Sequence, residues 1–281
     1  MRCSTNKHGL ILCWLITAWI PAILLAAGPG ESIQDRVRIA LIIDDMGDRR
    51  IAGERALALP GPITYAFLPQ TPYAWQQASK AHQLKKEVML HLPMQSDHGN
   101  ALGNGALTLD MSKVRFLRTL RRNIASIPYL AGVNNHMGSL LTRDPTAMRW
   151  LMSALREAGL YFVDSRTTDA TVAERVAGSN LIASSRRDVF LDNIPRESEV
   201  RAQLHELLQT AREKGSAIGI AHPYPQTLAV LQEELPKLKE QGIELVPVST
   251  LVNSRRPLWH ASSSPLLKDV KNSKLSPSPI Y

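Results

Sequence analysis

Cysteine is almost absent from this sequence of 281 residues. The two cysteines, Cys3 and Cys13, fall within the first 27 residues, so the remaining chain can form no disulfide. No G-x-G-x-x-G or G-x-x-x-x-G-K motif follows the first apolar run of the body, which leaves nucleotide cofactors without a recognisable phosphate cradle. The local metal motifs H-x-x-x-H and H-E-x-x-H are missing as well. A metal site would therefore need residues that lie far apart in the sequence.

The body of the chain also lacks a strong excess of charge of one sign. The formal net charge is +8, but residues 1–27 contribute +2 and residues 253–281 contribute +4, which leaves +2 for the body. A nearly neutral domain gives no support for nucleic-acid binding. Residues 253–281 are rich in Ser, Pro and Lys and are predicted to form a disordered, solvated tail.

One long hydrophobic run is present, and it lies at the N-terminus. Arg2 and Lys7 precede the uncharged run from Leu10 to Ala27, which ends in small residues. This pattern predicts a secretory signal over residues 1–27, cut after Ala27. At about 18 residues the run is also long enough to remain as a signal anchor, which would be the protein's only attachment to a membrane. Either alternative predicts a protein exported to the periplasm or cell envelope.

The remaining 28–252 segment alternates apolar runs with amphipathic patterns. This alternation predicts an α/β fold with right-handed crossovers and a mostly parallel sheet. We favour a distorted (β/α) barrel with seven or eight strands, and an open doubly wound sheet is the alternative. The strand-like runs cover residues 39–43, 63–68, 87–92, 130–134, 160–163, 189–191, 217–221 and 243–248.

The first of these runs ends in two adjacent carboxylates. Residues 39–43 are all apolar, as expected for a strand buried on both faces, and Asp44 and Asp45 follow at once. Functional residues of parallel α/β folds gather at the carboxyl ends of the strands. The pair therefore indicates a site, although an aspartate here can also serve only as a helix cap.

Polar residues follow most of the later runs too. Three of the eight histidines stand at predicted strand ends, and acids and amides stand at the others. A barrel would gather these side chains at one rim. The residues concerned are His91, Asn134, Asn135, His136, Asp164, Asp192, Asn193 and His222.

Two histidines and one carboxylate form a suitable ligand set for a divalent metal, with positions left for water and substrate. We predict that Asp45, His91 and His136 bind such an ion, and zinc is the default for this set. The ion would activate a water molecule, Asp44 would take the proton of that water, and His222 would protonate the leaving amine. The alternative is that each histidine is a hydrogen-bonded structural residue.

Several stretches of the sequence resemble a known family. The strand ending in two aspartates, the FLP ending of the second strand and the EVMLH stretch resemble the polysaccharide deacetylase superfamily. The stretches NNHMGS, FVDSRT and HPYPQT resemble its divergent bacterial branch. The resemblance covers roughly residues 37–252.

This resemblance implies metal-dependent removal of N-acetyl or O-acetyl groups from a sugar at the cell envelope. It implies that Asp44 is the base, that Asp45 and His91 bind the metal, that Asp164 orients the base and that His222 is the acid. Gln95 stands where the usual pattern has a second metal-binding histidine, so His136 would have to supply the missing nitrogen.

The implied partner is an acetylated polysaccharide or a peptidoglycan-type glycan. Tyr73, Trp75 and Tyr224 follow predicted strands and could stack on sugar rings, or could simply cover the rim of the barrel. Four further arginines are candidates for holding an anionic glycan, although exposed arginines usually bind nothing: Arg143, Arg166, Arg186 and Arg187.

Three function hypotheses remain. The first is the metal-dependent deacetylase. The second is a catalytically inactive glycan-binding or envelope-binding protein on the same barrel, which the change at Gln95 favours. The third is a metal-dependent esterase or phosphoesterase, which would require a second metal and more carboxylates.

Overall fold

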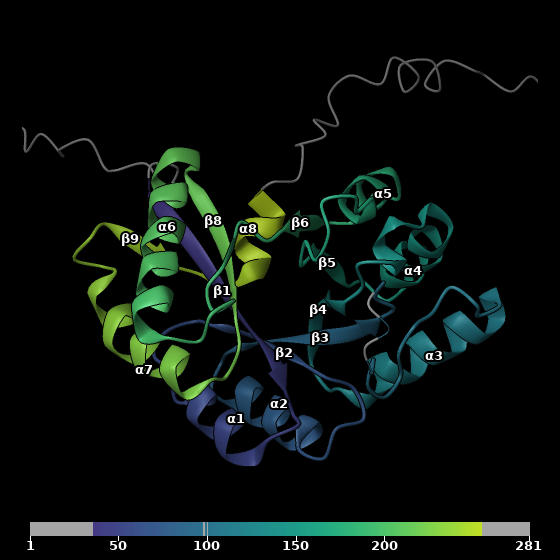
Figure 1. Cartoon of the computed structure of the whole chain (residues 1–281), viewed down its shortest axis with the longest axis horizontal. Coiled ribbons are helices and arrows are strands. Elements are labelled where there is room, and N and C mark those ends of the chain that lie inside the picture. The colour runs from purple at the N-terminus through teal and green to yellow at the C-terminus, as the bar shows by residue number, and fades with distance from the viewer. Residues whose placement is uncertain (1–35, 98, 100, 255–281) are drawn as a thin grey trace, which may run out of the picture. The chain divides into compact units, whose positions relative to one another are not determined.

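In the computed structural model, residues 36–97, 99 and 101–254 are described. Within them, eight parallel strands form one continuous sheet in the order β6-β5-β4-β3-β2-β1-β8-β7, and β9 pairs with β1 (Figure 1). The strands are β1 (Val37–Met46), β2 (Thr64–Phe67), β3 (Glu87–Met94), β4 (Leu130–Met137), β5 (Tyr161–Asp164), β6 (Ser184–Arg186), β7 (Val189–Phe190), β8 (Ser216–Ala221) and β9 (Ile243–Leu245).

This sheet confirms the predicted distorted (β/α) barrel. Every strand pairing is parallel, and β6 and β7 form the two ends of the sheet order, so the barrel is open between them. β9 pairs with the first residues of β1, while β2 pairs with its last residues. The described part contains one strand more than the predicted maximum, because the three-residue β6 reads SSR and has no apolar run to reveal it.

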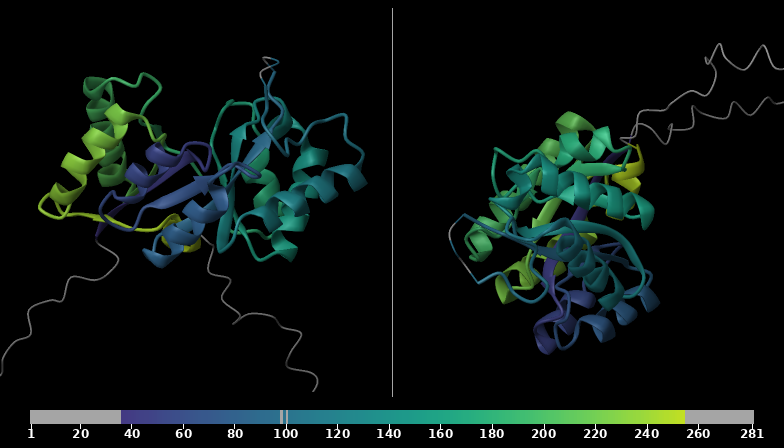
Figure 2. Two further views of the ribbon diagram at one scale, coloured as in Figure 1. Left: turned by 90° about the horizontal axis from the view of Figure 1, so that it is seen from below. Right: turned by 90° about the vertical axis from the view of Figure 1, so that its right-hand side faces the viewer.

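The helices and 3-10 turns of the described residues lie around the sheet (Figure 2). They are α1 (Arg50–Leu57), α2 (Ala74–Gln83), α3 (Lys113–Ser126), η2 (Leu141–Arg143), α4 (Pro145–Glu157), α5 (Ala173–Ser179), α6 (Glu197–Lys214), α7 (Pro225–Glu234), η3 (Leu235–Lys237) and α8 (Val248–Ser254).

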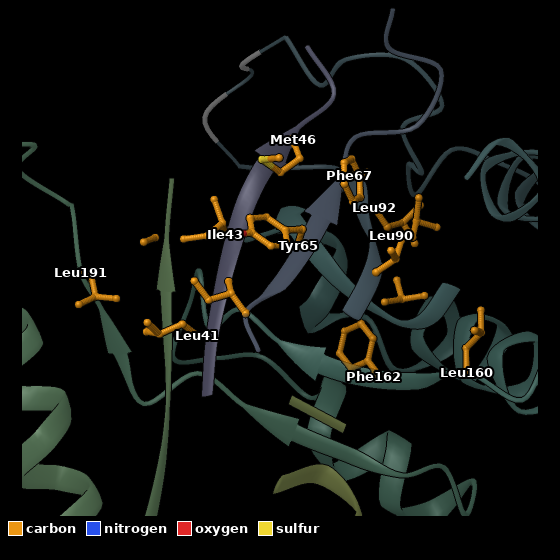
Figure 3. Close-up of a cluster of buried hydrophobic side chains, with 14 of the residues drawn as sticks. Leu41, Ile43, Met46, Tyr65, Phe67, Leu90, Leu92, Leu160, Phe162 and Leu191 are labelled. Carbon is orange, nitrogen blue, oxygen red and sulfur yellow. The ribbon is translucent and has the colours of Figure 1, made fainter. Parts of the chain in front are cut away.

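β1 is buried on both faces, as its continuous apolar sequence predicts. Ile39, Leu41 and Ile43 belong to the larger hydrophobic cluster, which also contains buried side chains of α1 to α7. Figure 3 shows Leu41 and Ile43 in this cluster. Ala40 and Ile42 point the other way, into a smaller cluster with residues of α8. The alternation of side chains along the strand therefore fills both layers of the core.

Local signals in the sequence set two of the helix ends. The Asp144 side chain accepts a hydrogen bond from the backbone N–H of Ala147 at 2.6 Å, which caps the start of α4. α6 ends at Gly215, whose φ of +81° is a left-handed conformation that glycine adopts without strain. Both signals are visible in the sequence.

The predicted signal at residues 1–27 lies outside the described residues, and so does the predicted tail from residue 255 onward. The first two residues of that tail, Asn253 and Ser254, are the last two of α8. Among the described helices, none combines the length and the apolar character needed to cross a membrane.

Candidate metal centre

The two aspartates that end β1 occupy different environments. Asp44 is buried, with 2% of its surface exposed, whereas a third of the Asp45 side chain is exposed. The backbone of Asp45 has a φ of +54°, and the pairing between β1 and β2 shifts register between Ile43 and Met46. This irregularity breaks the strict alternation of side chains along the strand. Both carboxylates consequently approach the histidines of neighbouring strands.

Asp45, His91 and His136 come together from β1, β3 and β4. The Nδ1 atom of His136 lies 3.0 Å from Nε2 of His91. The Oδ1 atom of Asp45 lies 3.3 Å from Nε2 of His91 and 3.1 Å from Nδ1 of His136. One oxygen and two nitrogens thus form a nearly equilateral triangle, built from the three residues that the sequence predicts as ligands.

The dimensions and chemistry of this triangle fit a tetrahedral metal ion. With metal–ligand bonds of 2.0–2.1 Å, neighbouring ligand atoms of a tetrahedral zinc site stand about 3.3–3.4 Å apart. Within the described part of the chain, the buried Oδ1 of Asp45 accepts no hydrogen bond of good geometry, although the two imidazole nitrogens lie within 3.3 Å of it. A cation in contact with all three atoms would satisfy this oxygen. We conclude that the residues present suit a divalent ion.

Asn134 links the ligand His91 to the aspartate Asp44. Its Nδ2 donates to Oδ1 of Asp44 at 2.8 Å, so its own Oδ1 is the acceptor for Nδ1–H of His91 at 2.9 Å. This arrangement directs Nε2 of His91 at the triangle. Burial alone would lower the pKa of His91, but the negative charge of Asp44 and the contacts with Asp45 raise it to about 9. A metal ion would have to displace the Nε2 proton.

Asp44 and Asp45 differ in pKa as well as in exposure. Burial raises the pKa of Asp44 above its ordinary value, and the nearby positive charges and Asn134 only partly oppose this. Burial acts in the same direction on Asp45, but its contacts with His136 and His91 hold the pKa of Asp45 far below the ordinary value. A raised pKa suits a proton acceptor, and a low pKa suits a metal ligand.

His222 approaches the triangle from the end of β8. Its Nε2 lies 3.8 Å from Oδ2 of Asp45, and its Nδ1 donates to Oδ1 of Asp192 at 3.0 Å. Asp192 is buried and also accepts hydrogen bonds from the backbone N–H of His222 and the hydroxyl of Thr227. Burial opposes protonation of His222, but the bond to Asp192 and the charge of Asp44 raise its pKa. Its Nε2 therefore faces the centre, and its pKa lies above the ordinary histidine value.

Asp192 is a further candidate site residue, to which the sequence alone gives no role. Its position after an apolar run was visible, but its partnership with His222 depends on the pairing of β7 with β8. That pairing places two strand ends side by side that are 30 residues apart in the chain.

Asp164 and Gln95 contact other parts of the rim. The carboxylate of Asp164 accepts from the backbone N–H of Arg166 at 2.9 Å and from the hydroxyl of Thr171 at 2.8 Å. Burial raises the pKa of Asp164. Asp44 accepts a hydrogen bond from Asn134 and lies 3.6 Å from Nδ1 of His91, so an orienting role for Asp164 stays a prediction. The Gln95 side chain accepts from the backbone N–H of Leu109 at 2.8 Å.

The four arginines named as candidates for glycan binding each contact other groups of the protein. Arg187 donates to the backbone oxygens of Ser165 and Arg166, and the other three lie near carboxylates. The three carboxylate pairs are Arg143 with Asp97, Arg166 with Asp169 and Arg186 with Glu174. Of the aromatic candidates, Tyr224 lies beside His222 with ring centres 5.5 Å apart, and Trp75 is 65% exposed.

The fold and the strand-end cluster define an α/β barrel with a candidate metal centre at the carboxyl ends of its strands. The profile of the divergent polysaccharide deacetylase family matches residues 41–252. The chain belongs to that family, which confirms the resemblance predicted from the motifs.

Two relatives and one solved structure illustrate these similarities. The uncharacterized protein YibQ of Escherichia coli K12 is 38% identical over 216 residues, which are 77% of this chain and 67% of that protein. An uncharacterized protein of Haemophilus influenzae is 36% identical over 214 residues, covering 76% of each. The crystal structure of the uncharacterized protein ATU2773 from Agrobacterium tumefaciens superposes with a TM-score of 0.76 at 24% identity. It covers 78% of this chain and 91% of that one, and the likeness shows the fold alone.

Proposed function

We propose that this protein is an exported, metal-dependent hydrolase that removes N-acetyl or O-acetyl groups from an envelope polysaccharide. The observation that carries the proposal is the triangle formed by Asp45, His91 and His136. Asp44 and His222 approach the same centre, and their pKa values are both raised. Membership of the divergent polysaccharide deacetylase family supports the same activity.

Each residue of the site has a separate role in the proposed reaction. A divalent ion held by the triangle, for which zinc is our choice, would polarise the acetyl carbonyl and make a water molecule more acidic. Asp44 accepts the proton of the attacking water, because its buried carboxylate has a raised proton affinity. His222 donates the Nε2 proton to the leaving nitrogen or oxygen, while Asp192 holds Nδ1. Asn134 keeps His91 and Asp44 in position.

The location and the substrate are parts of the same proposal. Export to the periplasm or cell envelope follows from the signal predicted at residues 1–27. The proposed substrate is an acetylated polysaccharide or a peptidoglycan-type glycan, and Tyr224 beside His222 offers an aromatic face for a sugar ring.

Acetate release from acetylated glucosamine oligomers tests the proposal. We expect the zinc-loaded protein to release acetate, and Asp44→Asn and His222→Ala to lower the rate by about 10²–10⁴-fold, the usual contribution of a general acid or base. His205→Ala is the matched control, because His205 is an exposed histidine of α6. Release that is unchanged in both site variants would contradict the proposal.

A second candidate is a glycan-binding protein without turnover on the same barrel. The feature that favours it is Gln95, which stands where the superfamily's usual pattern has a metal-binding histidine and whose side chain contacts Leu109. This candidate predicts that the protein binds glycan oligomers and retains metal but releases no acetate. The same assay therefore separates the two functions.

A further inference from the structure

A basic groove adjoins the candidate metal centre on its α1 side. A small cavity of about 140 Å³ beside Asp45 and His222 is also lined by Arg49 and Tyr224. Both of these residues line a second, larger groove of about 490 Å³, so the two hollows share a border. The described residues lining the larger groove include three arginines and no acid. Its arginines are Arg49, Arg50 and Arg55.

The backbone of two groove arginines, Arg49 and Arg50, is held by a side chain from the neighbouring helix. α1 contacts both α2 and α7 (Figure 1). The buried Gln77 of α2 accepts from the backbone N–H of Gly47 at 3.1 Å and donates to the backbone oxygens of Arg49 and Arg50 at 3.2 and 3.3 Å. Gly53 leaves room for it, because a Cβ there would lie 2.2 Å from the Gln77 amide. These hydrogen bonds hold the backbone of Arg49 and Arg50 in a fixed position relative to the end of β1.

Two of the three groove arginines have no carboxylate partner among the described residues that would neutralise their charge. Within the described part of the chain, Arg49 and Arg55 have no carboxylate within 4.0 Å, whereas Arg50 is 3.4 Å from Glu54. All three are exposed. Tyr73 and Tyr224 add aromatic surface to the same groove. Guanidinium groups bind carboxylate or phosphate in a bidentate manner, and tyrosine rings stack on sugars.

We propose that this groove binds an acidic substituent, a carboxylate or a phosphate, on a sugar next to the one placed at the metal centre. The position of the acetylated sugar rests on the proposed function, whereas the preference for acidic glycans rests on the groove alone. The protein would therefore select an acidic glycan over a neutral one of the same length.

Calorimetric measurement of binding to three tetrasaccharides tests this inference. Every protein measured also carries Asp44→Asn, so that hydrolysis does not interfere. The probes are neutral N-acetylglucosamine tetramer, its 6-O-phosphorylated form, and the alternating tetramer of N-acetylglucosamine and N-acetylmuramic acid, which carries carboxylates. We expect at least one acidic probe to bind about tenfold more tightly than the neutral probe, because exposed arginine–anion pairs each add a modest amount to affinity. The probe that shows the preference identifies the acidic group.

The preference should disappear when Arg49→Glu and Arg55→Glu are combined, and also when both are changed to Gln, which removes charge with less effect on folding. The matched control combines Arg118→Glu and Arg122→Glu, two exposed arginines four residues apart on α3, and should keep the preference. Two results would overturn the inference. One is equal affinity for all three probes, and the other is a preference that persists in both double variants of Arg49 and Arg55. Because binding is measured without turnover, failure of acetate release leaves this result unaffected.

Discussion

At the scale of single residues, the most informative side chain is Asn134. Its amide joins the proposed metal ligand His91 to the proposed base Asp44, with hydrogen bonds of 2.9 and 2.8 Å. A carboxylate here would place a second negative charge beside Asp44, and an apolar residue would remove the hydrogen bonds that Asn134 makes to Asp44 and His91. The site therefore depends on an amide at this position.

Replacing Asn134 with Leu should weaken metal binding by about 10–100-fold, the usual effect of removing a partner that orients a metal ligand. Titration of the metal-free protein with zinc against a competing chelator measures this change. Asn193→Leu is the matched control, because Asn193 is an exposed asparagine that follows β7. An Asn134 variant that binds zinc as tightly as the Asn193 variant would show that the amide does not orient His91.

Asp192 is the second residue whose role can be tested singly. Asp192→Asn keeps the shape of the side chain but removes the charge that holds His222 protonated at Nδ1. We expect acetate release to fall by about 10²-fold or more while zinc binding is unchanged, because Asp192 does not contact the triangle. Asp169→Asn, at a fully exposed aspartate, serves as control. Loss of zinc together with activity would argue that Asp192 acts on the whole site.

At the scale of helices and strands, the sequence was most informative where burial alone determines structure. β1 was predictable because a strand covered on both faces is a continuous apolar run, and β3 because four of the five residues from Val88 to Leu92 are apolar. The short β6, α5 and α8 were missed because their residues are ordered by packing: α8 contributes Val248, Leu251 and Val252 to the smaller core cluster.

The candidate site was predictable to a similar degree. His91, His136 and His222 could be selected from their places near the ends of strand-like runs. His91 is the second-last residue of the run 87–92, His136 stands two residues after the run 130–134, and His222 directly follows the run 217–221. The pairings of Asp192 with His222 and of Asn134 with Asp44 could not be derived, because they depend on which strands are neighbours and on the register between them. The arginines of α1 were missed because exposed helical arginines give no signal in a sequence.

The contact between α1 and α2 gives a stability prediction at this scale. Gly53→Ala should destabilise the protein by about 1–3 kcal/mol, because the added Cβ would clash with Gln77 and outweigh the better helix propensity of alanine. Gly178→Ala is the control within α5, where a Cβ meets nothing within 4 Å, and it should stabilise by about 0.5–1 kcal/mol. Urea denaturation measures both. Equal effects of the two substitutions would contradict this packing.

At the scale of the whole molecule, two buried tyrosines should lower the free energy of unfolding at alkaline pH. Tyr65 donates to the backbone oxygen of Ala56 at 2.5 Å, and Tyr161 donates to Glu87 at 2.9 Å. Burial raises the pKa of Tyr65, and burial together with the charge of Glu87 raises the pKa of Tyr161. Both phenols therefore keep their protons in the folded state at a pH where the unfolded chain loses them.

The stabilisation from these neutral phenols is complete below about pH 10, the ordinary tyrosine pKa, and is lost as the pH rises further. We expect the free energy of unfolding to fall by about 1.4 kcal/mol per pH unit for each tyrosine above pH 10. Urea denaturation at a series of pH values measures the slope. Tyr161→Phe should reduce it, while Tyr129→Phe, at a tyrosine that is 57% exposed, should not. Identical slopes in both variants would disprove the assignment.

The central claim is that Asp45, His91 and His136 hold one divalent ion, with His136 in place of a histidine at position 95. Elemental analysis of the full chain, purified without chelators and dialysed against trace zinc, tests it most directly. We predict one ion per chain in the natural protein and in Gln95→Leu, because the natural Gln95 side chain contacts Leu109 and not the triangle. We predict no ion in His136→Gln. A natural protein without metal, or an ion that His136→Gln retains, would contradict the claim.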